Sequence, residues 1–197
     1  SWVAIPLFIM LGDLMTTTGI TRRLVNFSMT LVGHIRGGLS HVSVLTNTLL
    51  AGMSGSITAD AAAVGAIFGP SMEKAGYHRG YTAAIVATGA VIGPMLPPSI
   101  SFIIVGTVGE ISILNLFMGG IIPGFLTAIG LMISGYVIAR RRGYRAEQKA
   151  TWKHRWNEFV PAIPALFLPL VIIGGMRAGL FTATEAGAVG IVYAIII

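Results

Sequence analysis

Two interrupted apolar segments hold the side chains that could do chemistry. Residues 37–72 carry one charge, Asp60, and read GMSGS at 52–56. Residues 80–110 are uncharged until Glu110 and read GPMLPPS at 93–99. Because glycine weakens a helix and proline lacks an amide proton, both runs predict a stop in the helix. The hydroxyls beside the two stops are those of Ser54, Ser56, Thr58 and Ser99.

Helix ends of this kind suit two ligands of opposite charge. The last carbonyls of a helix carry partial negative charge and suit a hard cation such as Na⁺, whereas the first free N–H groups of the next helix suit an anion. Serine and threonine hydroxyls can add oxygen ligands to either ion. The two breaks could therefore hold a cation and an anionic substrate together.

Asp60 has two interpretations. It falls in the first turn of the helix that follows the first break, where the helix dipole stabilises a carboxylate. A bare charge at membrane depth costs roughly 2.5–3.5 kcal/mol, which the dipole alone does not offset. The carboxyl is therefore expected either to act at the site or to cap its helix and bond a neighbouring hydroxyl.

Composition places the whole chain in a membrane. Hydrophobic residues make up 54% of the 197 residues and charged residues only 10%. Residues 111–139 and the apolar part of 159–197 are each long enough to cross a hydrocarbon layer of about 30 Å. The halves of 37–72 are each shorter than the roughly 20 residues that a span needs, so they predict a re-entrant helical hairpin. The absence of cysteine excludes disulfides and thiolate sites.

Basic residues indicate the orientation. Seven of the thirteen Lys and Arg residues lie within 140–158, between two apolar segments. This pattern is more typical of a cytoplasmic loop than of a surface that binds nucleic acid. Arg36 and Lys74 flank the hairpin, so its mouth is also expected in the cytoplasm, with Arg177 on the far side.

Residues 1–36 predict a partial span followed by a second helix. The partial span covers Trp2 to Met15, and the apolar residues of 20–35 then recur at helical spacing. We interpret 20–35 as an amphipathic helix on the membrane surface; the alternative is an extension of the next span.

A hydrolase is the competing function. Residues 52–55 match the short Gly-x-Ser-Gly pattern of rhomboid intramembrane serine proteases, with Ser54 as the nucleophile. A serine nucleophile needs a positioned base, normally histidine. No histidine follows Ser54 within a membrane segment, since the four lie at His34, His41, His78 and His154.

Several motifs, spread in order along the chain, resemble one transporter family. They are similar to the large membrane subunit of the tripartite ATP-independent periplasmic (TRAP) transporters. The matching stretches are 4–8 (AIPLF), 33–38 (GHIRGG), 50–60 (LAGMSGSITAD), 76–77 (GY), 90–99 (AVIGPMLPPS), 139–144 (ARRRGY) and 181–186 (FTATEA).

The resemblance implies a fold and a function. The fold would be an all-α integral membrane elevator with two inverted repeats, of which 37–110 is the transport region of the first and 159–197 holds the start of the second. The function would be Na⁺-coupled symport of organic acids, such as C4-dicarboxylates or sialic acids, across the bacterial inner membrane, and not enzymatic. The implied partners are a small membrane subunit and a periplasmic substrate-binding protein, with no cofactor beyond Na⁺ and no nucleic acid.

The resemblance also assigns the site. The expected sodium ligands are Ser54, Gly55, Ser56, Gly93 and Ser99. The expected substrate-binding residues are Ser56, Thr58, Asp60, Pro98 and Ser99. The chain begins and ends inside apolar runs, so we expect it to be the N-terminal half of a longer subunit.

Overall fold

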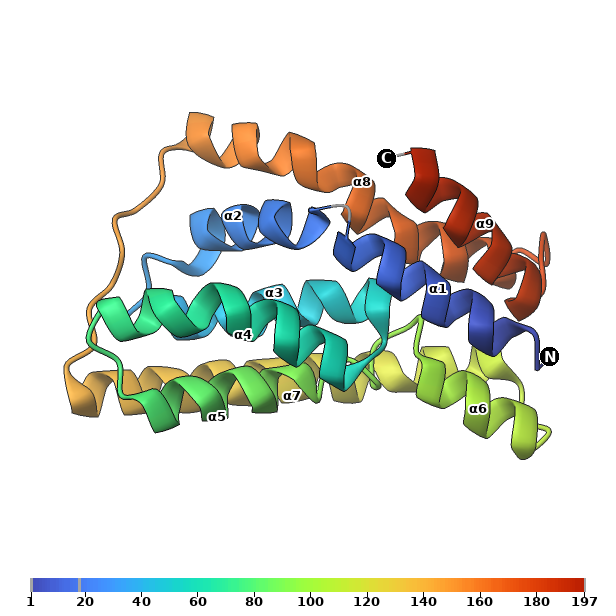
Figure 1. The fold of residues 1–197 in the computed structure, drawn as a ribbon, viewed down its shortest axis with the longest axis horizontal. Helices are drawn as coiled ribbons and strands as arrows, with labels where there is room; N and C mark the ends of the chain where they lie inside the picture. Colours follow the sequence, from blue (N-terminus) through green and yellow to red (C-terminus); the bar gives the residue numbers. More distant parts are fainter. Residues whose placement is uncertain (1, 18, 197) are drawn as a thin grey trace.

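The computed structural model describes residues 2–17 and 19–196. These residues form nine α-helices and no strand, which confirms the predicted all-α class (Figure 1). The helices are α1 (Ala4–Thr17), α2 (Ile20–Val32), α3 (Gly38–Ser54), α4 (Ile57–Lys74), α5 (Arg79–Ala90), α6 (Ile100–Val108), α7 (Ile113–Arg142), α8 (Trp152–Arg177) and α9 (Ala183–Ile196).

Helices α7 and α8 are the two among the described residues that are long and apolar enough to cross a membrane. They have 30 and 26 residues, lengths of about 45 Å and 39 Å at 1.5 Å per residue, against a hydrocarbon layer of about 30 Å. Large apolar side chains point outward from both: Ile122 is 70% exposed and Leu170 is 64% exposed. Such surfaces must be covered by lipid or by further protein, which supports a membrane protein.

The α3–α4 pair folds back on itself at Gly55 and Ser56. Gly55 has a left-handed φ of 56°, which ends α3, and Ser56 is the N-cap of α4, its hydroxyl accepting from the Ala59 amide. Because glycine adopts positive φ without a Cβ clash, it allows a sharp reversal here. The two helices then lie side by side (Figure 1).

The second interruption separates α5 from α6. Residues 91–99 are not helical, and they include the cis peptide bond between Pro97 and Pro98. Ser99 starts α6: its hydroxyl accepts from the Phe102 amide and donates to the Pro94 carbonyl at 2.7 Å. The proline-rich segment is thus held by hydrogen bonds at its C-terminal end.

Helix α3 occupies the centre of the protein. It packs against α1, α2, α4, α5, α7 and α8, whereas α1 lies along α9 and α2 along α8 (Figure 1). The polar residues of α3 are buried in these contacts, among them Ser43, Thr46 and Asn47. Protein surrounds α3 on every side, which explains how an apolar segment tolerates so many polar groups.

Some element ends differ from the sequence-based expectation. Helix α7 continues to Arg142 and α8 begins at Trp152, so the non-helical part of the basic region is shorter than 140–158. Arginine favours helices and stabilises a helix C-terminus, and the Thr151 hydroxyl caps α8 by accepting from the His154 amide. Helix α2 ends at Val32 rather than residue 35, with Gly33 as its C-cap.

Candidate functional site: the junction of two broken helices

The tip of the α3–α4 hairpin lies against the break between α5 and α6. A Cβ atom placed on Gly55 would lie 2.8 Å from the Pro98 carbonyl oxygen and 3.1 Å from the Ile100 amide nitrogen. Only a residue without a side chain lets the two backbones approach this closely. The two interruptions therefore meet at one place, which we call the junction: residues 54–60 and 93–100.

Gly93 makes a second close approach within the junction. A Cβ atom on Gly93 would lie 3.0 Å from Oδ2 of Asp60 and 3.1 Å from the Ala90 carbonyl oxygen. The Ser56 amide nitrogen would be 3.7 Å away. Gly93 thus brings the break against the hairpin at the Asp60 carboxyl.

Asp60 joins the two helices of the hairpin. The Ser54 hydroxyl, at the last residue of α3, donates a hydrogen bond to Oδ1 of Asp60, in the first turn of α4. Asp60 has 0% of its surface exposed, and its Oδ2 has no hydrogen-bond partner among the described residues. The structure thus shows the neighbouring-hydroxyl bond that the sequence left as one option, and directs a second carboxyl oxygen toward Gly93.

One helix ends at the junction and two begin there. Helix α3 ends at Ser54, and α4 and α6 begin beside Ser56 and Ser99. The unpaired carbonyls of a helix C-terminus are partially negative, and the first amides of an N-terminus are partially positive. A cation and an anion can therefore be held next to each other without any charged side chain at the surface of the site.

The five predicted sodium ligands all lie at the junction. Ser54 and Ser99 are buried, Gly55 and Gly93 are the two points of backbone contact, and Ser56 is half-buried. The structure thus assembles these residues, while their binding of Na⁺ stays a prediction.

The five predicted substrate-binding residues differ in their exposure to solvent. Thr58 is exposed, and its hydroxyl lies 3.3 Å from that of Ser56. Pro98 is buried, as are Asp60 and Ser99, which have no exposed surface. The Ser56–Thr58 pair is therefore the part of this set that faces outward, with the other three residues behind it.

A cavity of about 640 Å³ opens beside the hairpin tip and reaches helix α1. It is lined by Pro6, Ile9, Met10, Gly12, Asp13, Ser54, Ser56, Ala59 and Ile100. None of the site residues predicted from the sequence lies on α1. The signal that could have found one is a carboxylate, Asp13, in an otherwise apolar run.

Asn47 is a buried polar residue of α3 that was not predicted to belong to the site. Its side chain has no exposed surface, and neither amide atom has a hydrogen-bond partner among the described residues. A Cβ atom on Gly89 would lie 2.6 Å from Nδ2 of Asn47. Gly89 and Gly93 thus each lie against a polar side chain of the hairpin: Asn47 from α3 and Asp60 from α4.

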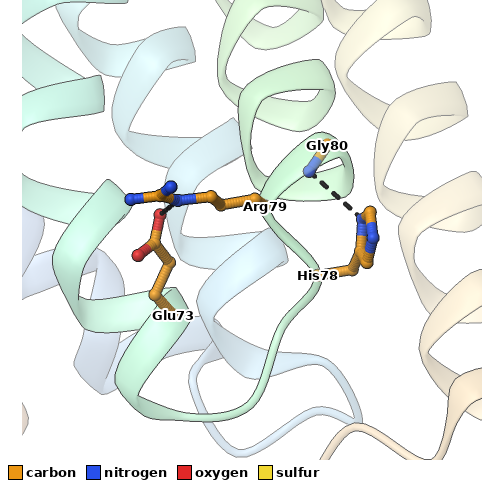
Figure 2. Close-up of polar contacts among 4 residues, drawn as sticks. All are labelled: Glu73, His78, Arg79 and Gly80. Atoms are coloured by element: carbon orange, nitrogen blue, oxygen red, sulfur yellow. Dashed lines mark hydrogen bonds and ion pairs between the residues drawn. The ribbon is translucent and has the colours of Figure 1, made fainter.

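The opposite end of the hairpin is tied to α5 by polar contacts (Figure 2). Arg79 donates to Glu73 at 2.8 Å, and this bond raises the pKa of the Arg79 guanidinium. Nδ1 of His78 accepts from the Gly80 amide at 3.2 Å, so His78 serves as the N-cap of α5. His78 thus has a structural role at the loop, away from the junction.

The described residues around Ser54 do not form the active site of a serine hydrolase. Its hydroxyl donates to Asp60 rather than to a histidine. His41, the histidine within α3, bonds the Arg36 carbonyl near the start of the helix, about 20 Å along the axis from Ser54 at 1.5 Å per residue. A nucleophile needs its base within hydrogen-bond reach.

Two interrupted helices that meet inside an all-helical, outwardly apolar protein are the arrangement typical of the binding sites of membrane transporters. The family comparison agrees over the full length. Residues 1–197 match the family model of the tripartite ATP-independent periplasmic transporter, DctM component. The chain belongs to this family of TRAP transporter large permeases.

Three relatives show how far the similarity extends. The chain is 46% identical over its whole length to a 2,3-diketo-L-gulonate TRAP transporter large permease protein of Escherichia coli, covering 46% of that relative. It is 42% identical over 98% of its length to a sialic acid TRAP transporter large permease protein of Vibrio cholerae, covering 45%. It is 39% identical over 97% of its length to a C4-dicarboxylate TRAP transporter large permease protein of Pseudomonas aeruginosa, again covering 45%. The chain thus spans about half the length of these relatives.

Proposed function

We propose that the complete subunit carries out Na⁺-coupled symport of an organic acid across the bacterial inner membrane. The observation that carries this proposal is the junction, where the end of α3 and the starts of α4 and α6 meet. The relatives named for 2,3-diketo-L-gulonate, sialic acid and C4-dicarboxylates support an acidic substrate.

The sodium ion would be held where α3 ends. Its proposed ligands are the hydroxyls and carbonyls of the five residues predicted from the sequence: Ser54, Gly55, Ser56, Gly93 and Ser99. Serine oxygens and helix-end carbonyls are hard ligands that suit a small cation. Asp60 would contribute through its bond with Ser54, which fixes the orientation of that hydroxyl.

The substrate carboxylate would lie at the helix starts. The Ser56 and Thr58 hydroxyls and the first amides of α4 form its exposed edge, and Pro98 and Ser99 supply the start of α6. Cation and anion would then partly neutralise each other, which is a physical reason for transporting them together.

The fold and partners complete the proposal. Residues 37–110 would move as the transport region of an elevator, with a re-entrant hairpin open to the cytoplasm. The second half of the subunit would supply an inverted repeat. A small membrane subunit and a periplasmic binding protein that delivers the substrate are proposed on family membership alone.

Serine substitutions in the complete transporter test the sodium site. Ser56→Ala and Ser99→Ala each remove a proposed ligand and also an N-cap worth about 1 kcal/mol. Ser112→Ala is the matched control, because Ser112 caps α7 in the same way, accepting from Asn115, outside the junction.

We expect the Na⁺ concentration for half-maximal uptake to rise in the two junction variants and to stay unchanged in Ser112→Ala. Uptake that shows no Na⁺ dependence in the wild type would refute symport. Unchanged sodium titrations in both junction variants would show that these hydroxyls serve only the local backbone.

A further inference from the structure

The cavity beside the hairpin tip has a marked charge asymmetry. Asp13 is the one charged side chain among the nine described residues that line its volume of about 640 Å³. The carboxylate is exposed, and the neighbouring cavity residues Ile9 and Met10 are apolar. The described lining of the cavity therefore presents one negatively charged side chain and no positively charged one.

Helix α1 holds this carboxylate next to the junction. A Cβ atom on Gly12 would lie 3.1 Å from the Ser54 carbonyl oxygen, so the backbone of α1 touches the last residue of α3. Asp13 is the next residue, and Ser54 and Ser56 line the same cavity. The cavity thus connects a full negative charge with the helix end at which the cation is proposed to bind.

The apolar character of α1 restricts what Asp13 can face. Within Ala4–Thr17 it is the single charged residue. A carboxylate at a lipid-facing position in a membrane segment costs several kcal/mol, and such residues generally face protein or a water-filled cavity and mark ion pathways. The adjoining cavity provides that second environment.

We propose that the cavity is the aqueous access route of the coupling cation to the junction and that Asp13 concentrates the cation in it. This inference rests on the proposed sodium coupling. Asp13 acts through the field of its charge and is not itself a ligand. The same field repels an organic acid, so the cavity admits the cation and excludes the substrate anion.

A substitution that removes the negative charge tests the role of Asp13 in the complete transporter, reconstituted in vesicles. A unit charge roughly 8 Å from an ion changes its binding about three- to tenfold when the effective dielectric constant is roughly 30–60. Asp13→Asn should therefore raise the Na⁺ concentration for half-maximal uptake about three- to tenfold. Asp13→Glu, which keeps the charge, should stay close to the wild type. The control is Glu147→Gln, which removes an exposed carboxylate outside the cavity.

A labelling experiment measures the accessibility and the charge preference of the cavity without requiring transport. The 197-residue sequence contains no cysteine. In a complete subunit otherwise free of cysteine, Ile9→Cys places a thiol in the cavity lining. A cationic methanethiosulfonate should react with it faster than an anionic one of similar size, and adding Asp13→Asn should reduce this preference about three- to tenfold. A cysteine at Gln148, in the basic region, should show a preference that Asp13→Asn does not change.

The outcomes separate this inference from the proposed function. A wild type with sodium-dependent uptake whose titration is unchanged by Asp13→Asn would overturn the role of Asp13 and leave symport standing. An unreactive Ile9→Cys would show that the cavity is closed to water and would overturn the access route. A wild type without sodium dependence would instead refute the proposed function.

Discussion

Gly55→Ala is the sharpest test of whether the two breaks must touch. The substitution has two costs in the structure. Alanine at the φ of 56° costs about 1–2 kcal/mol. The added Cβ would also lie 2.8 Å from the Pro98 carbonyl oxygen and 3.1 Å from the Ile100 amide, and relieving such overpacking costs about 1–3 kcal/mol.

A matched control separates the two costs. Gly76 lies in the turn between α4 and α5 with a φ of 83°, and a Cβ there would meet nothing within 4 Å. Gly76→Ala therefore carries the conformational cost alone. The alanine at a positive φ should lower the free energy of unfolding by a similar amount, about 1–2 kcal/mol, in both variants. Only Gly55→Ala should also force the hairpin tip away from the break.

Sodium titration is the assay that distinguishes them. If the overpacking cost of about 1–3 kcal/mol opposes the ion-binding geometry, the Na⁺ concentration for half-maximal uptake rises about 5- to 150-fold in Gly55→Ala. The upward shift of the melting temperature on adding Na⁺ to the purified complete transporter should shrink accordingly. Gly76→Ala should keep both properties near the wild-type values. Equal sodium titrations in the two variants would refute the conclusion that contact at Gly55 shapes the site.

Two further predictions concern the broken helix and the orientation of the chain. Replacing both Pro97 and Pro98 by Ala should let the segment approach a continuous helix, so that the protein still inserts while uptake collapses; near-normal uptake would move the proposed site to the hairpin alone. A membrane-impermeant thiol reagent applied from outside should label a cysteine at Gln148 poorly and one at Ala178 well, and the reverse pattern would overturn the proposed orientation.

The backbone features of the site could be predicted because their causes are local. Glycine and proline determine their own dihedral angles and hydrogen-bonding capacity, so the interruptions near Gly55 and at Pro97 follow from residue type alone. The serine caps follow in the same way, since Ser56 and Ser99 each bond an amide three residues further on. The ends of α7 and α8 were predicted less well, because arginine can continue a helix or enter a loop with little difference in energy.

The side-chain contacts of the junction depend on residues that are far apart in the sequence or on which way a helix faces. The bond from Ser54 to Asp60 needs the reversal at Gly55 to bring the end of α3 over the first turn of α4. The position of Asp13 needs α1 to pack on α3, and nothing within 4–17 specifies that partner. Sequence periodicity gives the face of a helix but not the neighbour that the face meets.

Helix α3 shows that the number of polar residues inside an apolar segment can nevertheless predict that the segment is buried in protein. Seven of its residues are buried polar side chains: Ser40, His41, Ser43, Thr46, Asn47, Thr48 and Ser54. In hydrocarbon each unpaired polar group would cost several kcal/mol, so such a segment cannot face lipid and has to lie inside the protein. The structure places it there. The same physical argument applies to the single carboxylate of α1, Asp13, which is exposed. Its exposed side must therefore meet water or further protein, which is why the cavity beside Asp13 matters for the path of the cation.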